Sequence, residues 1–313
     1  MSEPDRIDVH QHVVPPFWVE LLSRHGGDPS GWKYPVWSPE SALAFMDEQQ
    51  IQTGILSLTA PGVAGWTGQA AADMARRVNE YTAGLVIRNP SRFGNFITLP
   101  LPDMEASLKE LDYAYRHLNP DGVILLTNYK GIYLGDALYR PLWKALDKLG
   151  TCVFIHPAKP PMDPIPGLPG PLVDYPADTT RTALHMVVNG VIRDFENTRI
   201  ILSHAGGFLP YASHRFAELL PGLDPSLTKD GLLTDMKAFY FDTALSGSHV
   251  ALKSLLDFAK PCHVLYGSDY PYAPASVGAS FCRDLDSYAG YENDQLERIN
   301  NENGRALFKR LDT

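Results

Sequence analysis

The strongest chemical signal in the sequence is a pair of histidines near its start, in Asp8-Val-His10-Gln-His12. Residues 7–13 around the pair form a short apolar-rich run, which is typical of a buried β-strand. Because side chains alternate faces along a strand, His10 and His12 are expected to point the same way. Two neighbouring imidazoles can begin a metal site. Two ordinary hydrogen-bonded histidines are an equally good interpretation of this pair taken alone.

Three further ionisable residues end later apolar runs: His156 after Val153-Phe-Ile, His204 after Ile200-Ile-Leu-Ser, and Asp269 after Leu265-Tyr-Gly-Ser. If the runs are parallel strands of one barrel, these residues and the histidine pair all lie on the rim formed by the carboxyl ends of the strands. Barrel enzymes place their active sites on that rim. Packing alone does not account for polar residues at the ends of four strands. We therefore predict one shared functional site.

The elements that position these residues alternate along the chain. Apolar runs of strand length are separated by segments with helical spacing, for example 103–118 and 138–149. This alternation indicates parallel βαβ units. We predict an α/β fold, a (β/α)₈ TIM barrel that spans 1–313 as a single domain. The eight expected strands are 7–13, 54–59, 95–101, 122–127, 152–156, 199–204, 239–243 and 263–269.

Two stretches interrupt this alternation. Residues 15–39 contain glycines, an Asp-Pro step and three tryptophans, and we interpret them as a small insertion over the barrel mouth. Residues 157–176 are rich in proline, which predicts a stiff lid or wall beside the same mouth. Asp178 is a good N-cap residue, so a helix is expected to start near it.

Composition excludes several classes of function. The 313 residues are 44% hydrophobic and carry a net charge of −9 without a clustered basic face, so we expect no nucleic-acid partner. No apolar run approaches the roughly 20 residues of a membrane span, so no membrane association is expected. Three scattered cysteines and an N-terminus without basic and apolar blocks predict a cytoplasmic protein.

Four short motifs carry a resemblance to a known family: His-x-His, His-Pro, His-Ala-Gly-Gly and Gly-Ser-Asp-Tyr-Pro. Together they resemble the amidohydrolase superfamily, and more narrowly its aminocarboxymuconate-semialdehyde decarboxylase branch, over nearly the whole chain. The stretches 8–17 and 178–183 are also similar to 6-methylsalicylate decarboxylases. Members of this branch bind one divalent ion and mostly remove a carboxylate non-oxidatively from an aromatic or dienoic acid.

The resemblance implies roles for individual residues. It makes His10, His12, His156 and Asp269 the ligands of one divalent metal ion, with Zn²⁺ expected and Mn²⁺ as the alternative. It makes His204 the acid/base group beside the metal, and Asp269 a second catalytic residue that moves a proton. Related hydrolases bridge two metals with a lysine on the fourth strand. Residues 122–127 contain no lysine, which favours a single metal.

The resemblance also bears on the substrate. Arg215 follows His204 by eleven residues, where the muconate-semialdehyde enzymes place an arginine that reaches a neighbouring subunit's site. Arg215 is accordingly a candidate substrate-binding residue in a homodimer or higher homo-oligomer, with an exposed helix arginine as the equal alternative. Phe208 is the second candidate, because it follows the His204 motif and can flank a ring. The muconate-semialdehyde enzymes also carry an arginine in the helix after the insertion, and the matching residues 40–47 contain none. This departure from the family pattern implies a small carboxylic acid less charged than the muconate.

Three functions remain compatible with these residues. The first is metal-dependent, non-oxidative decarboxylation of a hydroxylated aromatic acid such as 6-methylsalicylate, or of a related unsaturated acid. The second is metal-dependent hydrolysis of a small cyclic lactone or amide, in which a metal-activated water attacks the carbonyl. The third is a metal-binding barrel without catalysis. Retention of both proton-transfer candidates, His204 and Asp269, argues against the third.

Overall fold

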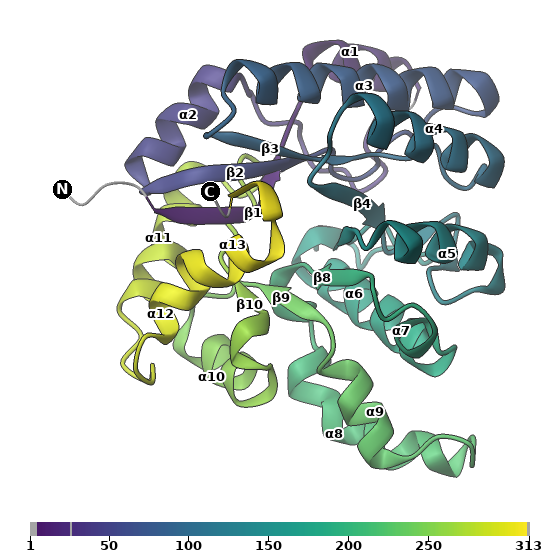
Figure 1. Ribbon diagram of the computed structural model, residues 1–313, viewed down its shortest axis with the longest axis vertical. Coiled ribbons are helices and arrows are strands. Elements are labelled where there is room, and N and C mark those ends of the chain that lie inside the picture. The colour runs from purple at the N-terminus through teal and green to yellow at the C-terminus, as the bar shows by residue number, and fades with distance from the viewer. Residues whose placement is uncertain (1–4, 26, 312–313) are drawn as a thin grey trace.

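The computed structural model describes residues 5–25 and 27–311, and Figure 1 shows their arrangement. Residues 1–4, which contributed to the cytoplasmic prediction, lie outside the described residues. Eight parallel strands form the centre, in the spatial order β1-β2-β3-β4-β7-β8-β9-β10. Their bounds are β1 Arg6–His12, β2 Ile51–Ser57, β3 Phe93–Ile97, β4 Gly122–Leu126, β7 Cys152–His156, β8 Arg199–Leu202, β9 Tyr240–Asp242 and β10 Val264–Leu265.

Backbone hydrogen bonds bring the first strand against the segment after the last one. Val9 N–H donates to the Tyr266 carbonyl at 3.0 Å, and His12 N–H donates to the Tyr270 carbonyl at 2.8 Å. Asp269 N–H in turn donates to the His10 carbonyl at 2.8 Å. The sheet is therefore a nearly closed barrel, and the expected TIM-barrel-like α/β fold is confirmed. Each of the eight expected runs overlaps one of these strands, although β1, β2 and β3 begin one to three residues earlier than expected.

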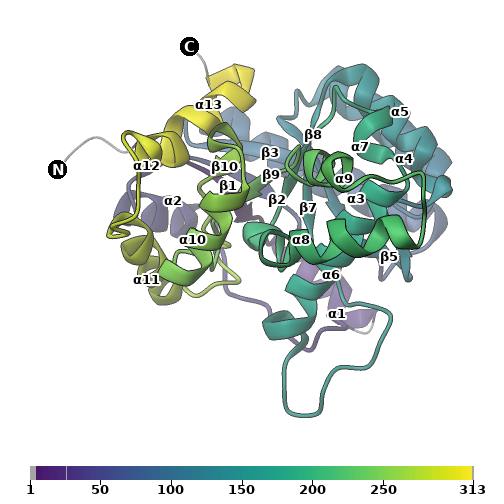
Figure 2. The same ribbon diagram turned by 90° about the horizontal axis from the view of Figure 1, so that it is seen from below.

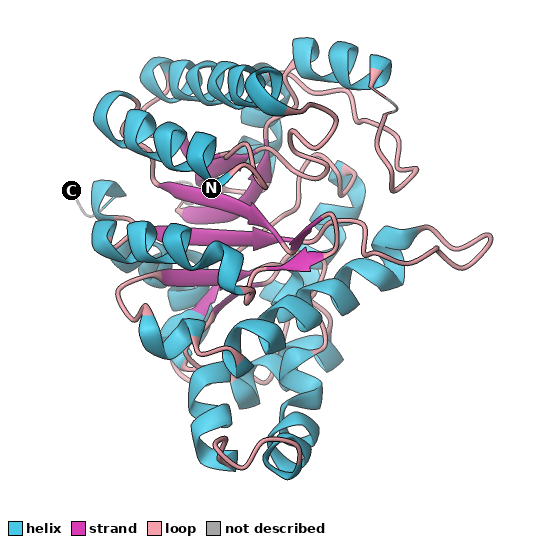
Figure 3. Ribbon diagram, turned by 90° about the vertical axis from the view of Figure 1, so that its right-hand side faces the viewer, coloured by secondary structure: helices cyan, strands magenta, loops and turns pink. Residues whose placement is uncertain are grey.

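Helices surround the strands, as Figure 3 shows, and α4 and α5 match the two helical segments expected from sequence. A short hairpin, β5 Asn128–Tyr129 and β6 Ile132–Tyr133, follows β4. No helix in the described part of the chain is both long enough and apolar enough to cross a bilayer. The helices are α1 Pro16–Arg24, α2 Pro39–Glu48, α3 Gly68–Arg88, α4 Met104–His117, α5 Arg140–Leu149, α6 Gly170–Val188, α7 Val191–Asp194, α8 Leu209–Leu219, α9 Lys229–Met236, α10 His249–Phe258, α11 Ala275–Asp286, α12 Gln295–Glu297 and α13 Asn303–Leu307.

The barrel interior has an apolar lower half at the amino ends of the strands. There the strands contribute one buried cluster, and residues after the last strand cover it from below. We call this set the lower cluster: Ile7, Val9, Ile55, Phe96, Ile124, Cys152, Phe154, Ile201, Leu265, Leu307, Phe308 and Leu311. The upper half, toward the carboxyl ends, holds the polar residues described below. Apolar burial in the lower half stabilises the fold that positions them.

A register irregularity in β1 determines which residues reach the upper half. Asp8 lies opposite Gly54 and Gln11 opposite Leu56, so β1 advances three residues where β2 advances two. Such an extra residue is a β-bulge, which redirects the side chains that follow it. Strict alternation would place His10 on the other face of the strand from Val9, which belongs to the lower cluster. The bulge lets Val9, His10 and His12 all face the interior.

The expected helix start near Asp178 is wrong. Helix α6 begins at Gly170, inside the proline-rich stretch, with Pro171 in its first turn, where a missing N–H costs nothing. Asp178 is fully buried in the middle of α6 and accepts hydrogen bonds from the Thr127 hydroxyl, from Asn128 Nδ2 (2.8 Å) and from the Tyr133 hydroxyl (2.6 Å). Its carboxylate therefore fastens the β5–β6 hairpin to α6 rather than capping a helix.

The two irregular stretches project from the same end of the barrel. Figure 2 shows the loop before α6 extending away from the barrel, and residues of both stretches, Asp28 and Pro160 among them, line one cavity. Within 15–39, residues 16–24 form α1, which the composition of this stretch did not predict. This helix begins with Pro16, whose fixed φ suits a first helical position.

Candidate metal centre

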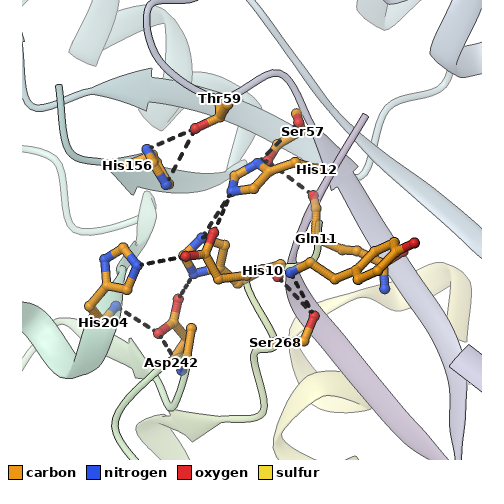
Figure 4. Close-up of polar contacts among 12 residues, drawn as sticks. His10, Gln11, His12, Ser57, Thr59, His156, His204, Asp242 and Ser268 are labelled. Atoms are coloured by element: carbon orange, nitrogen blue, oxygen red, sulfur yellow. Dashed lines mark hydrogen bonds and ion pairs between the residues drawn. The ribbon is translucent and has the colours of Figure 1, made fainter. Parts of the chain in front are cut away.

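Four buried side chains, His10, His12, His156 and Asp269, converge at the upper end of the barrel interior, and Figure 4 labels the three histidines. Nε2 of His10 lies 3.1 Å from Nε2 of His12, and Oδ1 of Asp269 lies 3.2 Å and 3.0 Å from these two nitrogens. With His156 included, one ligand atom from each side chain lies within 4.8 Å of the others. Each of the four residues is at most 7% exposed to solvent. These are the four ligands that the resemblance implied.

Each histidine of the group is held through its other ring nitrogen. Nδ1 of His10 lies 2.7 Å from a carboxylate oxygen of Asp242, and Nδ1 of His12 lies 3.2 Å from the Ser57 carbonyl. Nδ1 of His156 lies 2.9 Å from the Pro157 carbonyl. Carbonyl and carboxylate oxygens only accept hydrogen bonds, so Nδ1 carries the proton in each ring. Nε2 then presents a lone pair, which is the usual arrangement for a metal-binding histidine.

The resulting donor set fits a divalent cation. Three imidazole Nε2 atoms and one carboxylate oxygen meet in a dry space. Such a group is electrostatically unfavourable unless a cation lies among its members. Imidazole nitrogen and carboxylate oxygen bind Zn²⁺ at about 2.0–2.2 Å and also suit other first-row metals. The chain therefore has a divalent metal site.

Burial and charge favour the ligand forms of Asp269, His12 and His156, whereas the carboxylates beside His10 favour its protonated form, from which a metal ion would displace one proton. Burial raises the pKa of Asp269, but the charge of His10 and the hydrogen bonds from the surrounding histidines outweigh burial and hold that pKa well below its usual value. Burial lowers the pKa of His12 and of His156. Burial also lowers the pKa of His10, but Asp242 and Asp269 outweigh it and raise that pKa to about 10. The group holds an anionic carboxylate and two neutral imidazoles, the forms that bind metal.

His204 lies beside this group but is held differently. It follows β8, and its Nε2 lies 3.4 Å from Oδ2 of Asp269, the oxygen that faces away from His10 and His12. Its Nδ1 is buried and has no hydrogen-bond partner within the described ranges. His204 and Asp269 also have positive φ values of 53° and 59°. A left-handed backbone is strained for such residues and is concentrated at functional sites.

Asp242 supports His10 and His204, and it was not among the residues expected from sequence. Besides its contact with His10 Nδ1, its Oδ1 accepts from the His204 backbone N–H at 2.8 Å and from the Ala244 backbone N–H at 3.1 Å. The side chain is fully buried at the end of β9. Its position at the carboxyl end of a strand is the signal that identified the other site residues. A single aspartate before a threonine also reads as a turn residue, so the signal was weak.

Asp8 fixes the loop that carries Asp269. Its Oδ1 accepts from the backbone N–H groups of His10 and Ser268, both at 3.0 Å. Its Oδ2 accepts from the Ser268 hydroxyl at 2.6 Å and from Gln11 Nε2 at 3.0 Å. Burial raises the pKa of Asp8 to about 6, against the effect of these hydrogen bonds. One carboxylate thus joins the His10–His12 strand to the Asp269 loop.

Residues 7–310 match the model of the family described as amidohydrolase. The chain belongs to the amidohydrolase family.

Its relatives narrow the assignment within the family. The 6-methylsalicylic acid decarboxylase of Penicillium expansum is 42% identical over 315 residues, covering 98% of this chain and 97% of that protein. Decarboxylase yanB of Aspergillus niger is 41% identical over 324 residues, covering 98% and 88%. The crystal structure of an amidohydrolase II superposes with a TM-score of 0.91 at 30% identity, covering 97% of this chain and 99% of that one. This amidohydrolase is a carboxy-lyase, as expected in preference to a hydrolase or a barrel without catalysis.

The metal centre of this amidohydrolase opens into a cavity of about 460 Å³. His156, His204 and Asp269 lie on its wall, and so do Asp28 and Trp32 from the insertion. A second cavity of about 790 Å³ adjoins it and shares Asp28, Ala60 and Tyr175. The first cavity is large enough for one substituted benzene ring.

The two predicted substrate-binding residues have different positions. Phe208 lines the cavity beside the metal centre and is 45% exposed. Arg215 is exposed on α8 and does not line the cavity of its own chain. A contact between Arg215 and the site of a neighbouring copy therefore remains a prediction.

Proposed function

We propose that this amidohydrolase decarboxylates 6-methylsalicylate, or a closely related hydroxybenzoate, to carbon dioxide and the corresponding phenol. The observation that carries the proposal is a buried donor set for one metal ion that opens onto a cavity of about 460 Å³. The Penicillium expansum relative supports the choice of substrate class, because it is 42% identical and is named for 6-methylsalicylic acid.

The metal is proposed to be a single Zn²⁺, with Mn²⁺ as the alternative, held by His10, His12, His156 and Asp269. When bound, a divalent ion supplies Lewis-acid polarisation and a template for the substrate carboxylate and the adjacent phenolic oxygen. The chain's own contribution is to fix the donors. Asp242, Ser57 and Pro157 hold the three imidazoles through Nδ1, so the Nε2 atoms keep one orientation.

Proton transfer is assigned to Asp269 and His204. As the substrate binds, Asp269 takes up a proton from solvent, relayed by His204, and then delivers it to the ring carbon that bears the carboxylate. The new C–H bond forms, the electron pair of the C–C bond returns to the ring, and carbon dioxide leaves. His204 lies 3.4 Å from Oδ2 of Asp269, and its Nδ1 makes no other hydrogen bond in the part of the chain that is described. His204 can therefore return the proton or polarise the phenolic oxygen.

The substrate ring is proposed to pack on Phe208. This side chain lines the cavity and follows the loop of His204 directly, so a ring held at the metal centre lies within its reach. A Phe208→Ala variant should raise KM more than it lowers kcat, because packing on the ring acts on the bound substrate and on the transition state alike. An equal fall in kcat with unchanged KM would contradict this role.

A homodimer or larger homo-oligomer is proposed to bring Arg215 to the site of a neighbouring copy. The planar guanidinium would then bind the substrate carboxylate through paired hydrogen bonds. The test mixes Arg215→Ala chains with His204→Asn chains. Assembly with arginine acting across the interface should restore partial activity, whereas arginine acting within its own chain should restore none.

We also propose that 1–313 acts as one domain, with 15–39 over the barrel mouth, and that the protein is cytoplasmic. Asp28, Ser30 and Trp32 on the wall of the cavity support the position of the insertion. Deletion of 27–37 should abolish substrate binding and leave the metal bound. Cell fractionation tests the location.

The decisive experiment for the reaction uses metal-loaded protein and 6-methylsalicylate in D₂O. Decarboxylation releases one equivalent of carbon dioxide and gives 3-methylphenol with one deuterium at the carbon between its two substituents. His204→Asn, which retains the metal ligands, is the matched control and should release much less carbon dioxide. Turnover of small lactones without carbon dioxide release from any hydroxybenzoate would replace the proposed reaction with hydrolysis.

A further inference from the structure

The cavity beside the metal centre has an uneven distribution of charge. No lysine or arginine lines it among the described residues of the chain. Its ionisable lining consists of the metal-side residues His156, His204 and Asp269, two tyrosines, and one further carboxylate, Asp28. The cavity is thus lined by residues of the metal centre at one end and by a further carboxylate, Asp28, elsewhere on its wall.

Asp28 is positioned by the insertion rather than by the barrel. It is partly buried, and its Oδ1 accepts from the Ser30 backbone N–H at 2.8 Å. It lines both the metal-side cavity and the adjoining cavity, so the residue is common to both walls. No lysine or arginine forms an ion pair with it within the described ranges. Its negative charge is therefore available to act on whatever occupies the cavity.

The tyrosines near Asp28 are neutral hydrogen-bond donors. Burial, and then the charge of Asp28, raises the pKa of Tyr175 and of Tyr272. The Tyr272 hydroxyl is buried and has no hydrogen-bond partner in the described part of the chain. These phenols can donate to a neutral or hydroxylated ring, but they do not supply the positive charge that a second carboxylate would need.

We propose that Asp28 sets the charge selectivity of the site: it admits hydroxybenzoates with a single carboxylate and repels those with a second carboxylate on the side of the ring away from the metal. This inference rests on the proposed function and names the substrate class more closely. Two like charges about 6 Å apart at a partly desolvated site repel strongly enough to change binding tenfold or more.

The test compares two salicylates that differ only at the position para to the reacting carboxylate, where one carries methyl (4-methylsalicylate) and the other carboxylate (2-hydroxyterephthalate). The variant is Asp28→Asn, which keeps the size of the side chain and removes its charge. The matched control is Asp163→Asn, because Asp163 is exposed and lines only the adjoining cavity. The measured quantity is the ratio of kcat/KM for the two compounds.

Asp28→Asn should raise the relative kcat/KM for the dicarboxylate by about tenfold, and Asp163→Asn should change it less than about twofold. A change of less than twofold in Asp28→Asn, with metal content and melting temperature unchanged, would overturn the proposal. So would an equal change in both variants.

A binding experiment separates this inference from the proposed reaction. Benzoate and terephthalate are offered to metal-loaded wild-type and Asp28→Asn protein, and their dissociation constants are measured without turnover. The neutralised variant should gain affinity for terephthalate about tenfold more than for benzoate. If no hydroxybenzoate loses carbon dioxide, the proposed reaction fails while this ratio still decides the role of Asp28. An unchanged ratio refutes that role even if decarboxylation occurs.

Discussion

The same strands form both halves of the barrel interior, but the lower half stabilises the fold and the upper half holds the metal centre. In β7, Phe154 belongs to the lower cluster, whereas His156, two residues later, belongs to the metal centre. In β9, Tyr240 packs against the lower cluster, and Asp242 holds His10. The lower half is apolar and closed, and the upper half is polar and opens to a cavity. Two residues along a strand therefore separate a side chain that stabilises the fold from one that belongs to the metal centre.

The upper half is costly for the fold, and the lower half offsets that cost. The upper half buries Asp8, Asp242 and Asp269 and holds two residues, His204 and Asp269, in left-handed backbone conformations. Both features oppose folding. Burial of apolar side chains in the lower cluster contributes in the opposite direction. We therefore expect substitutions in the two halves to separate activity from stability, which the following predictions test.

The largest effect is expected from His10→Ala. Removal of one of the Nε2 donors should leave an incomplete site, so metal and activity should be lost together, while the folded barrel remains. Metal analysis of the purified protein and a carbon dioxide assay measure both quantities. His117→Ala, an exposed histidine of α4, is the control and should change neither. Stoichiometric metal in His10→Ala would refute the ligand assignment.

His204→Asn should lower kcat by about 10²- to 10⁴-fold, the range for loss of a general acid/base group. Metal content should stay at the wild-type value, because His204 faces Asp269 but is not among the four converging ligands. The value of kcat and the metal content are measured on the same preparation of the variant and compared with wild type. Loss of metal together with activity would show that His204 is itself a metal ligand.

Phe96→Ala tests the lower half. Phe96 packs against Phe154 and Phe308 with ring centroids 5.6 and 5.9 Å apart, and it is 3% exposed. The cavity left behind should lower the free energy of unfolding by about 3–5 kcal/mol, measured by denaturant titration. Phe96→Leu should lower it less. At 10 °C the folded fraction should retain wild-type metal content, and loss of metal there would break the proposed separation.

The smallest effect is expected from Asp242→Asn, which alters the support of a ligand rather than a ligand. Neutralising the acceptor for His10 Nδ1 should weaken metal affinity by about 10- to 100-fold. Competition with a chelator of known affinity gives the value. Asp257→Asn, whose exposed carboxylate pairs with Lys253, is the control and should leave the affinity unchanged. Unchanged affinity in Asp242→Asn would show that His10 is oriented by other contacts.

Much of the architecture could be predicted because apolar runs mark parallel strands buried on both faces. Runs that ended in His156, Asp269 or the His10–His12 pair placed the metal ligands on one rim before any geometry was known. The bulge between Asp8 and Gln11 could not be predicted, because it depends on how β1 pairs with β2 and leaves no mark in local composition. Strand alternation alone would have placed Val9 and His10 on opposite faces.

Two acidic residues show where local preference fails. Asp178 has the properties of a good N-cap, but its carboxylate accepts hydrogen bonds from three side chains of the segment 127–133. Asp242 reads as a turn residue, yet its two oxygens hold the side chain of one site histidine and the backbone of another. Both roles depend on partners distant in sequence, which tertiary packing brings close.

The central claim is that one buried cation site in the upper half performs the decarboxylation. The most direct test is to remove the metal with a chelator and titrate Zn²⁺ or Mn²⁺ back while measuring carbon dioxide released from carboxyl-labelled 6-methylsalicylate. The rate should rise linearly and reach a plateau at one metal per chain. Full activity in the metal-free protein, or a plateau only at two metals per chain, would contradict the claim.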